Sequence, residues 1–355
     1  MRKPANDLLM RGAFIPAMPL ALNADREFNE YVQRRLIRYY LESGADGLAV
    51  GVHTTQFAIR DPKINLFERV LKVSIDEMRA YSTETGRTVL AVAGVCGETE
   101  QAVGEARTAA SLGYDLALLS PGGLGHLSED DMVERTRQVA SVMDVMGFYL
   151  QIAVGGRAFS FDYWKRVCDI EGVKAIKCAA FDRYRTVDVA RAIAFAPHEI
   201  ALYTGNDDSI VTDLHTKYRF TDGGETKTVS TRGGLLGHWC AWTSAAVRLF
   251  QRIKALPEGA SVPQDLLSLA AAVTDVNGAF FDAHNGFGGC IAGMHEVLRR
   301  QGLMDGVWCL DPKEALGPGQ AEEITRVYRM YPELSDDAFV KAFLEKYSAA
   351  HPLKR

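Results

Sequence analysis

The chain has 355 residues, a hydrophobic fraction of 47% and a formal net charge of −5. This length suits one large α/β domain with a C-terminal extension, and the acidic balance argues against nucleic acid and anionic membrane surfaces as partners. No apolar run reaches the length of a membrane span, and no signal-peptide pattern follows Met1. We therefore expect a cytoplasmic protein with no membrane partner.

The cysteines and histidines give no pattern typical of a metal site. Six cysteines are scattered without a Cys-x-x-Cys pair, and eight histidines lack the His-Glu-x-x-His spacing. Cysteines of this kind in a long chain are most simply reduced, mostly buried thiols. We therefore expect neither disulfides nor a metal.

Helical segments that end near a glycine alternate with short apolar runs along the first two thirds of the chain. Glycine accepts the left-handed conformation that caps a helix, and apolar runs without alternation are typical of buried parallel strands. The candidate strands are residues 13–18, 47–52, 88–94, 116–120, 148–153, 173–178, 200–204 and 234–237. The amphipathic stretches between them are residues 28–41, 66–82, 98–110, 130–146 and 187–196.

This alternation predicts an α/β fold with about eight βα units, which is the number in a (β/α)8 TIM barrel. A doubly wound open sheet is the alternative. Its supporting motif, Gly-x-Gly-x-x-Gly after the first strand, is absent from the sequence, so the barrel is favoured.

Two segments fall outside the alternation. Residues 215–232 alternate around Asp222-Gly-Gly224 and predict a β-hairpin inserted after the seventh strand. From about Pro263 the chain is expected to be helical, either packed on the barrel or forming a subunit interface. The predicted division is a catalytic barrel over residues 1–260 and a helical extension over residues 261–355, with helices at 264–281, 294–301, 312–330 and 335–348.

Lys177 ends the sixth predicted strand, in the run Val173-Lys-Ala-Ile-Lys177. A buried lysine must be paired or lose its proton, and a neutral amine at a barrel mouth can form a Schiff base with a carbonyl substrate. The alternative is a strand-end lysine that reaches solvent, as Lys174 in the same strand would do.

Other strand ends offer partners for such an amine. Tyr149 would be a proton shuttle, because a phenol both donates and accepts. The hydroxyls of Thr54 and Thr55 and nearby backbone N–H groups would hold a carboxylate. The alternatives are a core aromatic for Tyr149 and ordinary turn residues for the threonines. Gly205 and Asn206 follow the seventh predicted strand; they are further candidates for the site, and the alternative for them is a simple strand-to-helix turn.

Taken together, these segments resemble the dihydrodipicolinate synthase and N-acetylneuraminate lyase family of class I aldolases. The resemblance runs from about Gly12 to the helices after the eighth strand. It rests on Gly12–Pro19, Glu42–Gly51, Ala91–Gly94, Val173–Lys177, Leu202–Asp208 and the spacing of Tyr149 from Lys177.

The resemblance implies that Lys177 forms an imine with a 2-oxo acid such as pyruvate and that Tyr149 shuttles protons. Residues 51–56, which include His53, Thr54 and Thr55, would grip the carboxylate, and Gly205 and Asn206 would bind substrate in the strand-7 turn. It also implies a homo-oligomer, dimer or tetramer, that needs no organic cofactor and no metal, since the imine forms on the protein itself.

Three departures from the family pattern set this chain apart. The threonine motif reads Gly51-Val-His-Thr-Thr-Gln56, so either His53-Thr54 or Thr54-Thr55 takes the paired-threonine role. Val154 stands where dihydrodipicolinate synthases place an arginine, for which Arg157 is a candidate substitute. Gly122-Gly123 replaces a Tyr-Tyr pair. Lysine biosynthesis is therefore not the expected role.

The main hypothesis is a lyase that cleaves or dehydrates a 2-oxo acid through a Lys177 imine. A condensing synthase with the same chemistry and a non-catalytic 2-oxo acid-binding or regulatory protein are the alternatives. A phosphosugar barrel is less favoured, because Gly233–His238 is better explained as the eighth strand than as a phosphate cradle.

Overall fold

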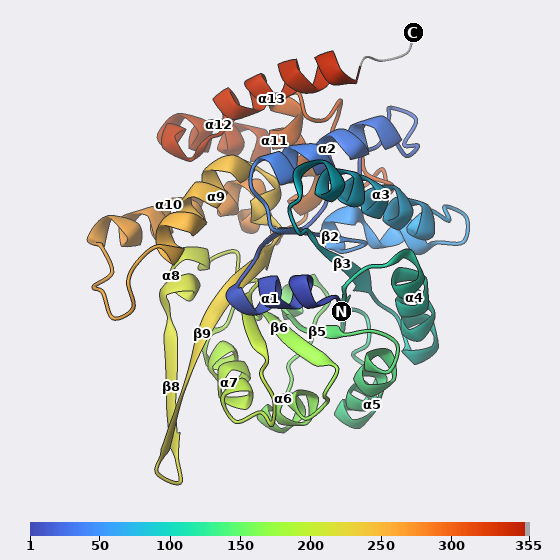
Figure 1. The fold of residues 1–355 in the computed structure, drawn as a ribbon. Helices are drawn as coiled ribbons and strands as arrows, with labels where there is room; N and C mark the ends of the chain where they lie inside the picture. Colours follow the sequence, from blue (N-terminus) through green and yellow to red (C-terminus); the bar gives the residue numbers. More distant parts are fainter. Residues whose placement is uncertain (352–355) are drawn as a thin grey trace.

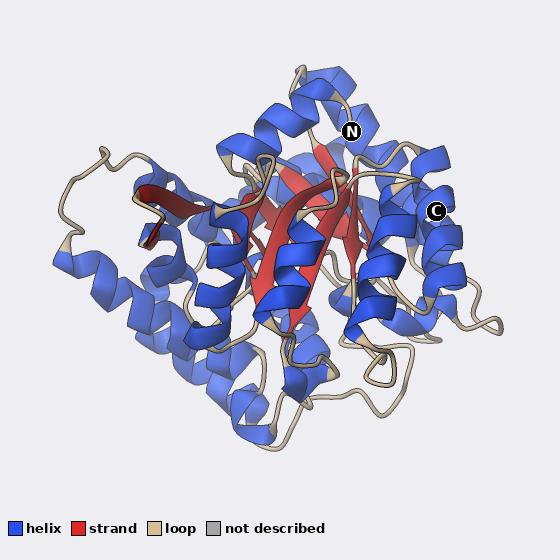
Figure 2. Cartoon of the chain, turned by 90° about the horizontal axis from the view of Figure 1, so that it is seen from below, coloured by secondary structure: helices blue, strands red, loops and turns tan. Residues whose placement is uncertain are grey.

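The computed structural model describes residues 1–351, and its centre is a nearly closed barrel of eight parallel strands surrounded by helices (Figures 1 and 2). The strand order is β1-β9-β7-β6-β5-β4-β3-β2, and a parallel bridge from Ala17 to Ala49 joins the two ends of this order. The protein is a (β/α)8 TIM barrel with C-terminal helices. The barrel strands are β1 (Phe14–Pro16), β2 (Gly47–Val50), β3 (Leu90–Val95), β4 (Leu116–Leu119), β5 (Val145–Leu150), β6 (Val173–Ala179), β7 (Ala201–Thr204) and β9 (Glu225–Leu236).

The helices cover the outside of the barrel and extend beyond it at the C-terminus. Several begin at side-chain caps, such as Ser128 and Ser160, whose hydroxyls accept from backbone N–H groups of the first turn. The helices are α1 (Lys3–Arg11), α2 (Glu30–Glu42), α3 (Phe67–Thr85), α4 (Thr99–Leu112), α5 (Glu129–Ala140), α6 (Phe161–Cys168), α7 (Arg183–Ala194), α8 (Ile210–His215), α9 (Thr243–Lys254), α10 (Gln264–Phe280), α11 (Cys290–Arg300), α12 (Gln320–Met330) and α13 (Asp337–Ala350).

Helix α1 closes the amino-terminal end of the barrel. Its Leu8 and Leu9 pack with inward-facing strand residues such as Leu116 and Leu235. The Tyr203 hydroxyl inside the barrel donates to the Leu9 carbonyl and accepts from the Ala13 N–H group, both at 2.8 Å. With this end filled by side chains, the opposite end, where the strands terminate, is the one that can hold a ligand.

An antiparallel hairpin lies where the sequence predicted one. Strand β8 (Lys217–Asp222) pairs with the first part of β9 across a turn at Gly223 and Gly224, both with positive φ. Strand β9 then continues into the barrel between β1 and β7, so the hairpin and the eighth barrel strand are one long strand. Residues 234–237 had been predicted from the sequence as a separate short strand. That the hairpin is an insertion relative to related proteins stays a prediction.

The C-terminal helices share a hydrophobic core with the barrel. Residues of α10 to α13, among them Phe280, Val297 and Phe343, belong to the same buried cluster as Phe14 of β1 and Leu36 of α2. Figure 1 shows α13 lying over α2. The predicted domain boundary near residue 260 stays a prediction, and the shared core shows that the extension packs closely on the barrel.

A buried carboxylate, Asp336, also joins the extension to the barrel helices. It is 3% exposed and accepts hydrogen bonds from the Tyr39 hydroxyl of α2, the Ser244 N–H group of α9 and the Gln301 side chain. A buried charge is tolerated when it is hydrogen-bonded in this way.

Several element boundaries differ from those expected. The helix predicted over 130–146 ends at Ala140, because Val145 and Met146 begin β5; the strand expected at 148–153 therefore lies at 145–150. The helix predicted over 312–330 begins only at Gln320. Helices α1, α6, α8 and α9 were not predicted.

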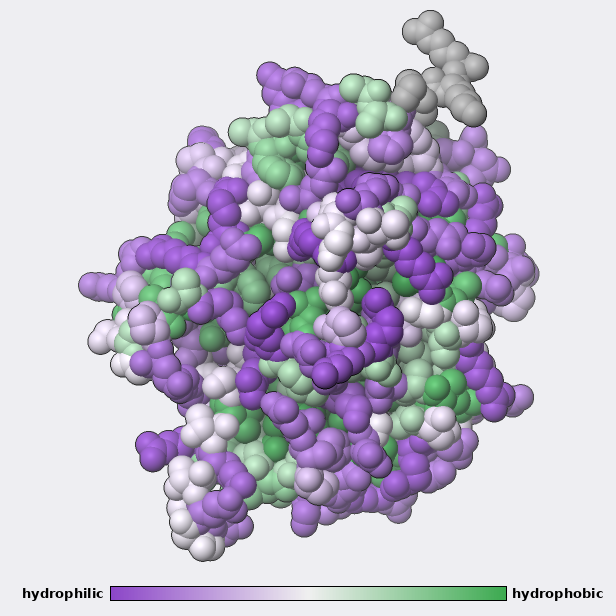
Figure 3. Space-filling model, viewed as in Figure 1, coloured by the Kyte–Doolittle hydropathy of each residue, from purple (hydrophilic) through white to green (hydrophobic). Residues whose placement is uncertain are grey.

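The surface is mostly hydrophilic on the face drawn in Figure 3, with hydrophobic residues in small separate areas. Within residues 1–351, none of the helices is both long and apolar enough to cross a bilayer.

Candidate active site

A cavity that is partly open to solvent lies at the carboxyl ends of the barrel strands. Its wall is mainly apolar and aromatic, with a few polar groups converging in it, which is the usual composition of a ligand site. It is lined by Ala17, Val52, His53, Thr54, Leu118, Phe148, Leu150, Gln151, Val154, Lys177, Ala179, Phe181, Gly205, Asp207, Gly237, Phe281, Phe287 and Cys290.

Lys177 lies on the inner face of β6 and is 8% exposed. Its ammonium group stands 4.4 Å from the centre of the Phe148 ring, on the neighbouring strand β5. Among residues 1–351, the Lys177 Nζ atom has no carboxylate within 4.0 Å, in contrast to most buried lysines. Burial therefore lowers the pKa of Lys177, and the negative charge of Asp207 opposes this shift.

Gly205 makes room for the lysine side chain. It directly follows β7, the strand that pairs with β6. A Cβ atom at this position would lie 2.4 Å from the Cε atom of Lys177. Any residue other than glycine would therefore displace the amine. The sequence predicted a substrate-binding role for Gly205, and the structure gives it a place in the cavity wall beside Lys177.

Asp207 is the second ionisable group in the wall and is 6% exposed. Its Oδ1 atom accepts a hydrogen bond of 2.9 Å from the His238 N–H group at the end of β9. Burial raises the pKa of Asp207, while the His238 hydrogen bond and the Lys177 charge act in the opposite direction. Burial thus favours the uncharged forms of both groups, an amine and a carboxylic acid.

The turn after β2 supplies His53 and Thr54 to the cavity, whereas Thr55 lies behind it. Thr54 and Thr55 both donate their hydroxyl protons to the Met18 carbonyl, at 3.1 and 2.6 Å. Thr55 also accepts from the Gly51 N–H group. Burial and the Lys177 charge lower the pKa of His53 to about 4, so its imidazole is neutral at pH 7.

Tyr149 faces away from the cavity. Val145 is opposite Val173, but an irregularity in the pairing follows, after which Phe148 is opposite Lys177 and Tyr149 is opposite Cys178. A shift of one residue moves a side chain to the other face of a sheet. The Tyr149 ring packs on Trp164, outside the barrel, and its hydroxyl accepts from the Phe159 N–H group at 3.2 Å.

Arg157 and Asn206 also lie outside the cavity wall. The Arg157 guanidinium donates to the Leu127 carbonyl and stands over the Phe159 ring at 5.3 Å. Asn206 is 2% exposed, donates to Asp213 and accepts from the Phe181 N–H group at 2.9 Å. The structure therefore brings together Lys177, Thr54, His53 and Gly205, and leaves Tyr149, Thr55, Asn206 and Arg157 behind the wall.

Asp207 and the phenylalanines of the wall were not predicted from the sequence. Asp207 stands in the Gly205-Asn-Asp-Asp208 turn, and the alternation of strand residues could have placed it with Gly205 on the inner side. Phe287 belongs to a loop between α10 and α11, more than eighty residues after the end of the expected seventh strand at Thr204. Local sequence carries no signal for such a distant contact.

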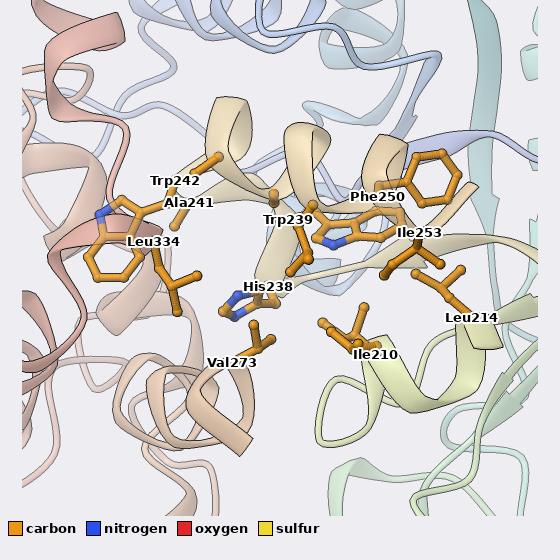
Figure 4. Close-up of a pocket in the computed structure, with 14 residues that line it drawn as sticks. Ile210, Leu214, His238, Trp239, Ala241, Trp242, Phe250, Ile253, Val273 and Leu334 are labelled. Atoms are coloured by element: carbon orange, nitrogen blue, oxygen red, sulfur yellow. The ribbon is translucent and has the colours of Figure 1, made fainter. Parts of the chain in front are cut away.

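A second, smaller cavity lies behind the His238 turn, between α8, α9 and α10. Figure 4 shows the His238 imidazole in this cavity, among Trp239, Val273 and Ile210. His238 thus separates the two cavities: its backbone holds Asp207 and its ring fills the apolar side. Within the described residues, no group of three or more His, Cys, Asp or Glu side chains is arranged to hold a metal ion.

The Lys177–Asp207 pair gives a prediction for pH titration. Competitive labelling of amines at increasing pH, read by mass spectrometry, should give Lys177 a pKa below the ordinary range of lysine. Asp207→Asn removes the charge that stabilises the ammonium form, so the pKa of Lys177 should fall further. Asp208→Asn, at the adjacent exposed position, is the matched control and should change the titration of Lys177 less than Asp207→Asn does. An unshifted Lys177 in the wild-type protein would contradict this account of the site.

Comparison with known proteins places the chain in a family. The model of the dihydrodipicolinate synthetase family matches residues 10–217. The chain is 25% identical to the 4-hydroxy-tetrahydrodipicolinate synthase of Moorella thermoacetica over 206 residues, which are 57% of this chain and 66% of that protein. It is 24% identical to the enzyme of the same name from Desulforamulus reducens over 201 residues, 55% of this chain and 63% of that protein. The match thus spans just under two thirds of these curated relatives.

Solved structures show the same fold at lower identity. The N-acetylneuraminate lyase of Fusobacterium nucleatum superposes with a TM-score of 0.70 at 17% identity, covering 91% of this chain and 99% of that one. The dihydrodipicolinate synthase of Oceanobacillus iheyensis gives a TM-score of 0.71 at 16% identity, covering 92% and 99%. Since the family model covers more than half of the sequence, this chain belongs to the dihydrodipicolinate synthetase family.

Proposed function

We propose that this protein is a lyase of the class I aldolase kind, which cleaves or dehydrates a 2-oxo acid through an imine on Lys177. The observation that carries the proposal is a buried lysine without a close counter-charge in the wall of the barrel's carboxyl-end cavity. Its lowered pKa leaves part of the lysine as the free amine, and the amine is the form that attacks a carbonyl. The relatives with known names, two synthases and a lyase, are consistent with this chemistry.

Asp207 is proposed as the proton-transfer group in this chain. When the Lys177 amine adds to the C2 carbonyl of the substrate, the carbinolamine must lose its hydroxyl group as water. Burial raises the pKa of Asp207, so part of it is the carboxylic acid, and this form supplies the proton for that step. The resulting carboxylate then sits beside the protonated imine and stabilises it. Tyr149, which was predicted for this role, has its hydroxyl on the far side of the sheet.

The turn that begins at His53 is proposed as the carboxylate-binding group. The first N–H groups of a helical turn have no partner within that turn. Here they belong to His53 and Thr54, both in the cavity wall. The Thr54 and Thr55 hydroxyls are committed to the Met18 carbonyl, so they fix the shape of the turn and the backbone N–H groups do the binding.

The imine acts as an electron sink. In the cleavage direction, the electron pair of the bond between C3 and C4 moves toward the protonated imine nitrogen as the C4 hydroxyl gives its proton to the Asp207 carboxylate. Asp207 returns this proton to C3 of the enamine, and water then releases pyruvate and restores the Lys177 amine. A condensing synthase runs the same steps in reverse, so the products formed from each pair of reactants decide the direction. Pyruvate-type substrates, the absence of a cofactor and a homo-oligomeric state remain proposals for this chain.

Borohydride trapping tests the imine. Incubation with pyruvate and reduction should add one pyruvate-derived group, located on Lys177 by peptide mapping. Lys177→Ala should abolish the adduct, while the control Lys174→Ala, on the same strand with its amine donating to the Glu171 carbonyl, should keep it. Gly205→Ala should also lose most of the adduct, because the new methyl group would lie only 2.4 Å from the Lys177 Cε atom. An adduct that survives Lys177→Ala would exclude the proposed chemistry, and an adduct without turnover of any 2-oxo acid would favour a binding protein.

The assignment of the proton-transfer group predicts opposite results for two conservative variants. Asp207→Asn should lower turnover by about 10²- to 10⁴-fold, the usual contribution of a general acid–base group. Tyr149→Phe should keep turnover near the wild-type value, because the hydroxyl points away from the cavity. Steady-state rates on a cleavable 2-oxo acid measure both. The assignment is wrong if Tyr149→Phe is the impaired variant and Asp207→Asn is not.

A further inference from the structure

Two phenylalanines in the cavity wall have backbone conformations that phenylalanine rarely adopts. Phe181, after β6, has a φ of 51°, and Phe287, in the loop between α10 and α11, has a φ of 68°. The left-handed region is unfavourable for a residue with a Cβ atom, and such outliers gather at ligand-binding sites, where the surrounding structure enforces them. Their rings meet edge to face, with centres 6.3 Å apart and planes at 74°.

Separate hydrogen-bond networks hold the two residues in place. The Phe181 N–H group donates to Asn206, whose own amide donates to Asp213. The Phe287 N–H group donates to the Asp282 carbonyl at 3.0 Å. The Asp282 carboxylate, 4% exposed, accepts from Asn285 and from the Gly289 N–H group. The barrel and the C-terminal extension thus each present one ring to the same space.

These rings are part of a wider aromatic wall. Phe148 and Phe281 also line the cavity, and both Phe181 and Phe287 remain partly exposed. The polar groups Lys177, Asp207 and Thr54 serve the 2-oxo acid end under the proposed function. Of the other described lining residues, only His53 and Gln151 have strongly polar side chains, and none is an arginine or glutamate.

This composition discriminates between substrates. The hydroxyl groups of a polyhydroxylated half would be desolvated against phenylalanine rings with few partners, which costs binding energy. A flat apolar group would instead pack edge or face against these rings, as aromatic pairs do.

We propose that the aldehyde half of the substrate is aromatic, so that the protein cleaves 4-aryl-4-hydroxy-2-oxobutanoates to pyruvate and an aromatic aldehyde between the Phe181 and Phe287 rings. The inference rests on the proposed imine at Lys177. The C3–C4 bond breaks with its electron pair passing to the imine, and the C4 hydroxyl gives its proton to the Asp207 carboxylate to become the aldehyde. Asp207 returns this proton to C3, and water hydrolyses the imine. The sum is one substrate giving two products, with no oxidant or reductant.

The test compares two substrates on the full-length protein, 4-hydroxy-2-oxo-4-phenylbutanoate and a six-carbon 3-deoxy-2-oxo sugar acid. The rate of pyruvate release should give a kcat/KM for the aryl substrate at least about tenfold higher. Phe181→Leu and Phe287→Leu should each lower kcat/KM for the aryl substrate by a larger factor than for the sugar acid. Phe195→Leu is the matched control, because Phe195 ends α7 at 40% exposure and is not among the lining residues.

Pyruvate trapping on the same variants separates this inference from the proposed function. Pyruvate occupies only the lysine end, so the leucine variants should still form the borohydride adduct on Lys177. If the wild type forms the adduct but cleaves the sugar acid as fast as the aryl substrate or faster, the aromatic inference alone is overturned. The same holds if the wild type forms the adduct and does not cleave the aryl substrate. Absence of any adduct in the wild type would remove the proposed function, and the inference with it.

Discussion

The burial of one lysine beside one aspartate is the constraint on which the rest of the site depends. Removing charges from water is costly, and Lys177 and Asp207 are both more than nine-tenths buried at the end of the barrel. The surroundings do not repay this cost with an ion pair within 4.0 Å in the part of the chain described. They shift both groups toward their uncharged forms, which are a nucleophile and an acid. The stability of the fold alone would not favour a buried lysine and aspartate that lack an ion pair.

The neighbouring elements are arranged to keep that pair in position. Gly205 has no side chain where the lysine passes, and the backbone of His238 fixes the aspartate. Phe148 stands over the ammonium group from the adjacent strand. Each of these residues comes from a different barrel strand or from the turn that follows it, so the site is the meeting point of strand ends that the barrel closure brings together. The C-terminal extension completes it, because Phe287 and Cys290 form the far wall.

The barrel and the lysine could be predicted from the sequence, and the reasons are local. Glycine-capped helices followed by unbroken apolar runs recur with the period of βα units, and Lys177 ends one of these runs. Tyr149 shows where this reasoning stops. Its distance from Lys177 in the sequence was suggestive, but the pairing of β6 with β5 passes over Lys174, so Phe148 rather than Tyr149 comes opposite Lys177 and Tyr149 lies on the other face of the sheet. Such an irregularity depends on how the two strands pack and leaves no mark in either strand alone. Asp207 and Phe287 were missed for related reasons, since their importance comes from what they face across the cavity.

The most direct test of the central claim is a crystal structure of the protein after pyruvate and borohydride treatment. The account predicts a covalent link from the Lys177 Nζ atom to C2 of the former pyruvate, with Asp207 beside the nitrogen and the carboxylate against the His53–Thr54 turn. It also predicts that the Tyr149 hydroxyl still accepts from the Phe159 N–H group. Pyruvate bound at another lysine, or a rearranged β5 that turns Tyr149 into the cavity and Phe148 out of it, would contradict the account.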